Sequence, residues 1–253
     1  MPNRINLKKS RIYWLPNVIT TCGLFSGFYA IVQAMNSNFE LAAMAIFVAM
    51  VFDILDGRVA RITRTESDFG AEYDSLSDMV AFGAAPALIM YEWGLKGMNK
   101  FGWFAAFVYC GCAALRLARF NTAPPDVDKG YFRGLPSPAA AGLLAGYVWT
   151  VEVYGFAFNY FAWACWSITL FAGASMVSNI HYYSAKDVDL RKTVPFWVLV
   201  LMVFLTIVTF QITENLPEIL FLFFTLYAFS GYFGFVTQYL MKKRNKETIG
   251  KSG

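Results

Sequence analysis

Charged residues are scarce in this chain of 253 residues: they make up 15% of it, whereas hydrophobic residues make up 57%. Soluble domains carry about 25% charged residues, so this composition excludes an ordinary soluble protein. Apolar stretches of about 20 residues, the length that crosses a bilayer, recur along the chain. A Pro/Ser-rich linker and low-complexity tracts are also missing. We therefore predict one membrane-embedded domain over residues 1–253.

Cysteine and histidine are too few to suggest a zinc site. The four cysteines lie within apolar runs, and Cys110 and Cys112 form a C-x-C pair without a second pair or a nearby histidine. The single histidine, His181, ends an apolar stretch and is interpreted as an interfacial residue. The net charge of +4 does not indicate nucleic acid as a partner, because the basic residues are spread between the apolar stretches.

The apolar stretches predict an all-α, polytopic membrane helix bundle, since only helices satisfy the backbone of such segments in lipid. We expect eight transmembrane helices, at about 15–35, 40–62, 72–95, 101–122, 137–157, 159–182, 194–212 and 216–241. If the N-terminus is cytoplasmic, 19 of the 21 lysines and arginines fall on the cytoplasmic side, and only Lys96 and Lys100 do not. The positive-inside rule thus predicts that both termini are cytoplasmic.

Acidic residues concentrate where the second and third spans meet. Asp53 and Asp56 are three residues apart, and Asp74 and Asp78 are four apart, so each pair shares a helix face. A short turn joins the two helices, which predicts that the four carboxylates converge at the cytoplasmic edge of the bilayer. Four carboxylates repel one another unless a cation lies between them, and oxygen ligands favour Mg²⁺ or Mn²⁺ over zinc. The alternative is that some cap helices or pair with arginine, as Asp68 and Asp74 are placed to do.

Small residues accompany these aspartates. Gly57 and Ala60 lie on the same helix as the first pair, and Gly70 lies at the turn. Their missing or short side chains would let a phosphate or sugar approach the backbone closely.

The whole pattern resembles the signature of the CDP-alcohol phosphotransferase family. It consists of eight positions over 26 residues, all of which match: Asp53, Asp56, Gly57, Ala60, Arg61, Gly70, Asp74 and Asp78. The resemblance implies a six-helix core over about 12–182, with two further helices over about 194–241. It also implies a metal-assisted displacement on a CDP-linked lipid at the cytoplasmic side of the cell membrane.

The resemblance further implies a role for each residue. Asp53 and Asp74 would bridge two Mg²⁺ or Mn²⁺ ions, Asp56 and Asp78 would each complete one site, and Asp78 would act as the general base. The CDP-lipid would be bound by Asn17, Thr20, Gly57, Ala60, Arg61, Ser67 and Gly70. Asn17 and Thr20 belong to a Pro-Asn-x-x-Thr stretch of the family, although Asn17 also has the position of a helix N-cap after Pro16.

A second polar cluster indicates the acceptor alcohol. Arg116, Arg119 and Asn121 close the fourth span, and Arg133 precedes the fifth. Three guanidiniums at the membrane edge suit a carboxylate or phosphate. The stretches R-L-A-R-F-N and G-L-P-S-P-A-A-A resemble the phosphatidylserine synthase branch of the family, which implies CDP-diacylglycerol, or an ether-lipid equivalent, and L-serine as substrates. We also expect a homodimer.

Two alternatives remain at this point. The arginines would equally hold a phosphate, which leaves glycerol 3-phosphate or inositol phosphate as acceptors. An ion or solute transporter fits the composition, but it would place its carboxylates near the bilayer midplane, in discontinuous helices. Here the aspartates lie near one edge of their spans.

Overall fold

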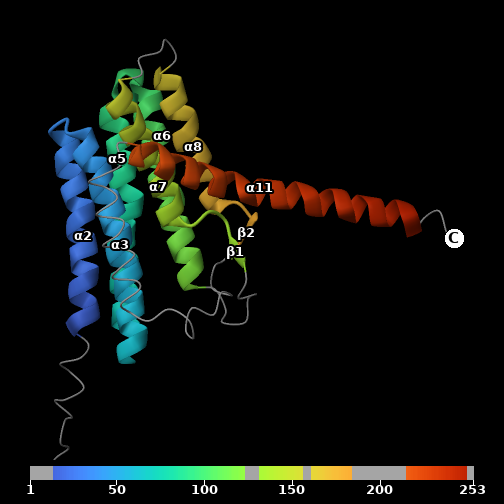
Figure 1. Cartoon of the computed structure of the whole chain (residues 1–253), viewed down its shortest axis with the longest axis horizontal. Helices are drawn as coiled ribbons and strands as arrows, with labels where there is room; N and C mark the ends of the chain where they lie inside the picture. Colours follow the sequence, from blue (N-terminus) through green and yellow to red (C-terminus); the bar gives the residue numbers. More distant parts are fainter. Residues whose placement is uncertain (1–13, 123–130, 156–160, 184–214, 250–253) are drawn as a thin grey trace, which may run out of the picture.

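The structure is a computed structural model that describes residues 14–122, 131–155, 161–183 and 215–249. It is helical apart from one pair of short strands (Figure 1). The longer helices are α2 (Trp14–Met35), α3 (Phe39–Thr63), α4 (Asp68–Asp78), α6 (Lys100–Asn121), α7 (Ser137–Tyr154), α8 (Phe161–Val177) and α11 (Leu216–Ile249). Helix α4 continues through a π-helical turn η1 (Met79–Ala84), α5 (Ala85–Met90) and a second π-helical turn η2 (Tyr91–Leu95), before the 3₁₀ turn η3 (Lys96–Met98).

Seven of the eight predicted spans coincide with helical segments, and the predicted span 194–212 lies outside the described residues. Among the described residues, three helices are both long and apolar enough to cross a membrane: Trp14–Met35, Lys100–Asn121 and Leu216–Gly234. A helical membrane protein is therefore the architecture that the fold supports.

The strands are a feature that the sequence did not predict. β1 (Tyr131–Arg133) and β2 (His181–Tyr183) pair antiparallel, with Phe132 opposite Tyr182 and Arg133 opposite His181. The backbone extends this pairing, because Gly134 N–H donates to the Ile180 carbonyl at 2.8 Å. Gly134 has a φ of 83°, and a Cβ there would lie 2.1 Å from the Met176 carbonyl oxygen, so only glycine fits.

The turn between α3 and α4 positions both pairs of aspartates. Helix α3 ends at Thr63, and its C-cap residue Arg64 adopts a left-handed conformation, while Thr65 N–H donates to the Ala60 carbonyl at 2.9 Å. Ser67 then caps α4, since its hydroxyl accepts from Gly70 N–H at 3.0 Å. The cap is thus Ser67, and not Asp68, to which the alternative interpretation of the aspartates gave this role.

Helix α2 packs along both α3 and α4, the two helices that carry the aspartates. It begins at Trp14, so Asn17 lies inside its first turn, and the prediction of Asn17 as an N-cap was wrong. The helix approaches η1 so closely that a Cβ on Gly27 would lie 2.6 Å from Cα of Ala81. Small residues at such crossings bring helix backbones together in membrane proteins.

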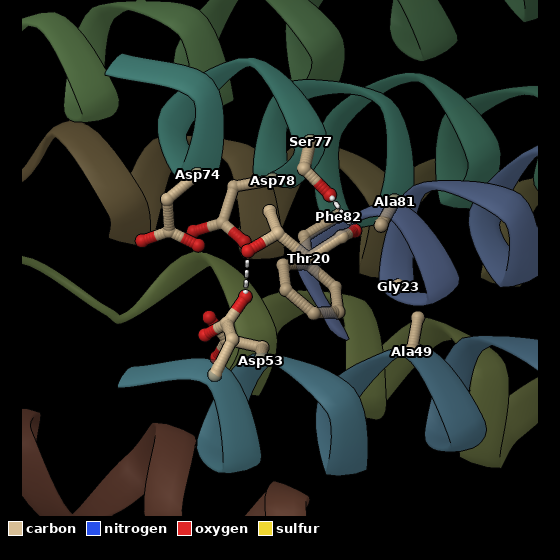
Figure 2. Close-up of a pocket in the computed structure, with 10 residues that line it drawn as sticks. Thr20, Gly23, Ala49, Asp53, Asp74, Ser77, Asp78, Ala81 and Phe82 are labelled. Atoms are coloured by element: carbon tan, nitrogen blue, oxygen red, sulfur yellow. Dashed lines mark hydrogen bonds between the residues drawn. The ribbon is translucent and has the colours of Figure 1, made fainter. Parts of the chain in front are cut away.

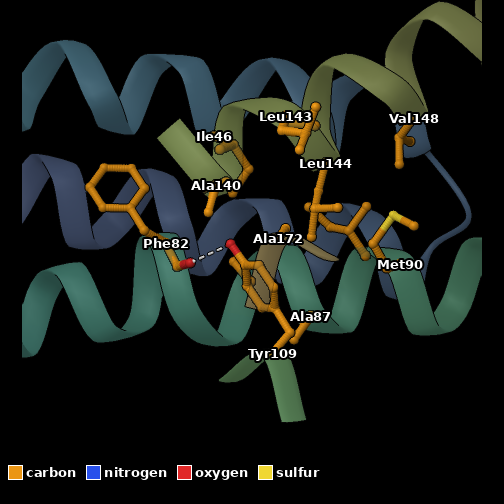
Figure 3. Packing of buried hydrophobic residues seen from close by; sticks show 14 of the residues in the cluster. Ile46, Phe82, Ala87, Met90, Tyr109, Ala140, Leu143, Leu144, Val148 and Ala172 are labelled. Carbon is orange, nitrogen blue, oxygen red and sulfur yellow. Dashed lines mark hydrogen bonds between the residues drawn. The ribbon is translucent and has the colours of Figure 1, made fainter. Parts of the chain in front are cut away.

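The core contains many alanines, with larger side chains filling the gaps (Figure 3). Pro86 has no N–H to donate to the Phe82 carbonyl one turn earlier. The Tyr109 hydroxyl on α6 donates to that carbonyl instead, at 3.0 Å (Figure 3). This bond ties α6 to the π-helical turn that directly follows Asp78.

Candidate metal and acceptor site

Three of the four predicted metal ligands come together. Asp53 and Asp56 on α3 and Asp74 on α4 each offer a carboxylate oxygen, and these oxygens all lie within 4.8 Å of one another. Asp78 lines the same small pocket as these three aspartates. Figure 2 shows Asp74 and Asp78 projecting from one helix toward Asp53 on the facing helix. A set of hard oxygen donors from two helices fits a Mg²⁺ or Mn²⁺ ion.

A hydrogen bond from α2 holds one of these ligands. The hydroxyl of Thr20, a residue only 5% exposed, donates to Asp56 Oδ2 at 2.5 Å. The same hydroxyl lies 3.1 Å from the Pro16 carbonyl oxygen. The Ser77 hydroxyl donates to the Thr20 carbonyl at 3.2 Å, which links α4 to the same turn of α2. Thr20, predicted to line the nucleotide, thus also orients a predicted metal ligand.

The predicted CDP-lipid residues lie in two groups around the α3–α4 turn. In the first, the Arg61 side chain folds back over Gly57 and donates from Nε to the Gly57 carbonyl at 2.8 Å. In the second, a Cβ on Gly70 would lie 3.1 Å from Ser67 Oγ and 3.6 Å from Asn17 Oδ1. The absence of a side chain at Gly70 therefore leaves these polar atoms close to the backbone. Ala60 follows Gly57 by one helical turn on α3.

The arginines predicted to bind the acceptor have different partners. Arg116 donates from Nη1 to the Ser137 hydroxyl at 2.5 Å, and its charge interacts with Asp53 and Asp78. Arg119 instead donates to Asn179 Oδ1 at 2.6 Å and contacts the Val177 carbonyl oxygen at 3.5 Å. Arg116 is therefore the arginine of α6 whose charge interacts with the aspartates, and Arg119 anchors α6 to the end of α8.

The other two predicted acceptor residues lie at the edges of this region. Asn121 exchanges hydrogen bonds with Ser75 of α4, at 3.0 and 3.2 Å, so the end of α6 is tied to the helix that carries Asp74. Arg133 is exposed on β1.

Two buried hydroxyls in the site were missed by the sequence analysis. Ser77 precedes Asp78, and Ser137 stands between two prolines and is 0% exposed. For Ser77 the available signal was its place beside Asp78, because a buried hydroxyl next to a functional carboxylate needs a hydrogen-bond partner. The residues next to Ser137 in the sequence gave no such signal.

An apolar helix bundle in which three carboxylates place oxygens within 4.8 Å of one another defines a membrane protein with a candidate site for a divalent cation. A family model described as CDP-alcohol phosphatidyltransferase matches residues 13–171. This chain belongs to the CDP-alcohol phosphatidyltransferase family, as the aspartate pattern predicted.

Curated relatives extend the similarity beyond that segment. The chain is 36% identical over 220 residues to a CDP-diacylglycerol–serine O-phosphatidyltransferase of Helicobacter pylori, which covers 87% of this chain and 90% of the relative. A protein of the same name from Methanocaldococcus jannaschii is 39% identical over 144 residues, or 57% of this chain and 65% of the relative. Another from Saccharomyces cerevisiae is 39% identical over 152 residues, or 54% of each chain.

Proposed function

We propose that this protein transfers the phosphatidyl group of CDP-diacylglycerol to the hydroxyl of L-serine, giving phosphatidylserine and CMP. The observation that carries this proposal is the similarity over 87% of the chain to a CDP-diacylglycerol–serine O-phosphatidyltransferase. The clustered aspartates and Arg116 support it. The reaction needs negative ligands for a divalent cation, which the aspartates offer, and a positive group for the serine carboxylate, which Arg116 offers. The protein would thus be a transferase of phospholipid biosynthesis.

The aspartates would hold the divalent cations. We assign Asp53 and Asp74 as ligands shared by two ions, and Asp56 and Asp78 as ligands of one ion each. Bound Mg²⁺ or Mn²⁺ would neutralise charge on the pyrophosphate and stabilise the departing CMP. Asn17, Ser67 and Gly70 at the start of α4, and Gly57, Ala60 and Arg61 on α3, would receive the CDP moiety.

Proton transfer is assigned to Asp78. A serine hydroxyl is a weak nucleophile, so a carboxylate must accept its proton as the new P–O bond forms. The acceptor oxygen would attack phosphorus directly, the bond to the CMP oxygen would break, and the Asp78 carboxylate would retain the proton. One displacement inverts the configuration at phosphorus, so a chiral thiophosphate substrate that reacts with retention would refute this route.

Arg116 is our assignment for the main ligand of the serine carboxylate. Its charge interacts with Asp53 and Asp78, and the Ser137 hydroxyl fixes one of its nitrogens. A guanidinium has five N–H donors, so several remain for a carboxylate. Arg119, Asn121 and Arg133 would complete the charged and polar rim of the acceptor site.

The arrangement in the membrane completes the proposal. We infer a single-domain, multi-pass protein of eight spans with both termini and the active site on the cytoplasmic side, acting as a homodimer. The basis for the orientation is the distribution of lysine and arginine along the sequence. Labelling of single cysteines introduced into the loops, from each side of sealed vesicles, tests it.

The function is tested by CMP release from CDP-diacylglycerol with three acceptors. Purified protein with Mg²⁺ or Mn²⁺ should release CMP with L-serine and form phosphatidylserine. Glycerol 3-phosphate and inositol phosphate should give only the background rate. Faster release with either phosphate-bearing acceptor would overturn the assignment of serine and leave the family reaction intact.

A further inference from the structure

A π-helical turn, η1, follows directly after Asp78, the residue assigned as the general base. At its end the Ala85 N–H donates to the Val80 carbonyl five residues earlier, whereas a regular α-helix would use the carbonyl four residues earlier. Such turns interrupt the regular ladder of hydrogen bonds and occur frequently at functional sites. The groups that hold η1 therefore bear on the position of Asp78.

One carbonyl of η1 is satisfied by a side chain from another helix. In a regular helix the Phe82 carbonyl would accept from the N–H of residue 86, but Pro86 has no N–H. The Tyr109 hydroxyl of α6 donates to this carbonyl at 3.0 Å, and Tyr109 is 0% exposed (Figure 3). A buried carbonyl that loses its donor costs free energy, so this bond stabilises η1 in its observed place.

Helices α2 and α6 both pack closely against η1. On the side of α6, a Cβ on Gly83 would lie 3.2 Å from Cβ of Ala113, one helical turn after Tyr109. On the side of α2, a Cβ on Gly27 would lie 2.6 Å from Cα of Ala81. Because η1 has little room to move toward either helix, the bond from Tyr109 fixes its position along α6.

This bond connects two parts of the proposed reaction. Phe82 and Asp78 line the same small pocket and are one helical turn apart. Tyr109 and Arg116 are seven residues apart on α6, which places them on one face of that helix. The bond from Tyr109 to the Phe82 carbonyl therefore sets the general base relative to the helix that carries the arginine assigned to the serine carboxylate.

We propose that Tyr109 is a positioning residue for the transfer reaction. By holding the Phe82 carbonyl, it keeps Asp78 where the serine hydroxyl reaches it while Arg116 binds the serine carboxylate. A general base must lie within hydrogen-bond reach of the proton that it accepts. Tyr109 acts through the backbone of η1 and not on the substrate. This inference rests on the proposed transfer to serine with Asp78 as its base.

The first test compares two buried tyrosines. Tyr109→Phe removes the hydroxyl and keeps the ring, and kcat with serine should fall roughly 10- to 100-fold, as expected when a reacting group is displaced by about 1 Å. The KM for CDP-diacylglycerol should stay close to wild type, because the residues assigned to this lipid lie on α2, on α3 and at the start of α4.

Tyr182→Phe is the matched control. Tyr182 is also 0% exposed, and its hydroxyl also donates to a main-chain carbonyl, that of Ala228, at 3.1 Å. Both variants lose the same kind of bond, so both should lower the melting temperature, but only Tyr109→Phe should lower kcat.

The second test restores the missing N–H. In Pro86→Ala the N–H of residue 86 becomes a donor for the Phe82 carbonyl, so the bond from Tyr109 is no longer required. Tyr109→Phe should therefore reduce kcat much less in the Pro86→Ala background than in the wild-type background, and a double-mutant cycle measures this difference. Equal reductions in the two backgrounds would overturn the inference, because the hydroxyl would then act elsewhere.

The outcomes separate this inference from the function on which it rests. A wild-type kcat in Tyr109→Phe overturns the role of Tyr109 and leaves serine transfer intact, and an equal loss of kcat in Tyr182→Phe overturns it too. If Tyr109→Phe does not fold, the double variant is compared with Pro86→Ala alone: similar kcat values support the inference, and a kcat at least roughly tenfold lower in the double variant overturns it. If the wild-type protein does not use serine, the proposed function itself fails.

Discussion

Thr20 offers the sharpest test of the proposed metal centre, because its hydroxyl donates to a predicted ligand from a different helix. Thr20→Val keeps the shape of the side chain and removes the 2.5 Å bond to Asp56 Oδ2. A hydrogen bond to a charged acceptor contributes about 1.5–3 kcal/mol, which corresponds to roughly a 10- to 150-fold change in an equilibrium constant. Residues that support metal ligands contribute a similar amount to metal affinity.

The assay is CMP release at increasing Mg²⁺ or Mn²⁺, with both substrates saturating. The metal concentration at half-maximal rate should rise roughly 10- to 150-fold in Thr20→Val, because Asp56 is no longer held toward Asp53 and Asp74. Excess metal should restore most of the rate.

Thr169→Val is the matched control. Thr169 is also buried in a helix and also bonds to the carbonyl four residues earlier, that of Cys165, at 2.6 Å. Both variants therefore lose a hydrogen bond to a carbonyl oxygen one helical turn earlier, and only Thr20→Val also loses a bond to an aspartate. Equal metal requirements in the two variants would refute the reasoning.

Four further predictions concern the charged residues. Asp53→Asn or Asp74→Asn should abolish turnover while the protein stays folded, and normal rates at saturating Mg²⁺ or Mn²⁺ would contradict their assignment as shared ligands. Asp78→Asn should lower kcat far more than it weakens CDP-lipid binding; an unchanged kcat would exclude it as the base. Arg116→Ala should raise the serine KM roughly 10- to 150-fold, since it removes a bond between charged groups. Arg119→Ala should instead lower the melting temperature, because its partners lie at the end of α8; a larger effect on the serine KM than that of Arg116→Ala would reverse these two roles.

The helices and the aspartate faces were predictable because both are local properties of the sequence. Apolar runs of membrane-crossing length specify helices whatever their neighbours are. Spacings of three and four residues then place Asp53 with Asp56, and Asp74 with Asp78, on one face each. The family signature added the expectation that the two faces meet, and the structure brings Asp53, Asp56 and Asp74 together.

The tertiary structure decided which groups support these residues, because such contacts depend on where helices cross. The bond between Thr20 and Asp56 joins positions 36 residues apart and depends on how α2 packs against α3 and on its approach to η1 at Gly27. The partners of Arg116 and Arg119 differ although the two share a helix face, since Ser137 and Asn179 come from distant segments. No local pattern encodes such pairings.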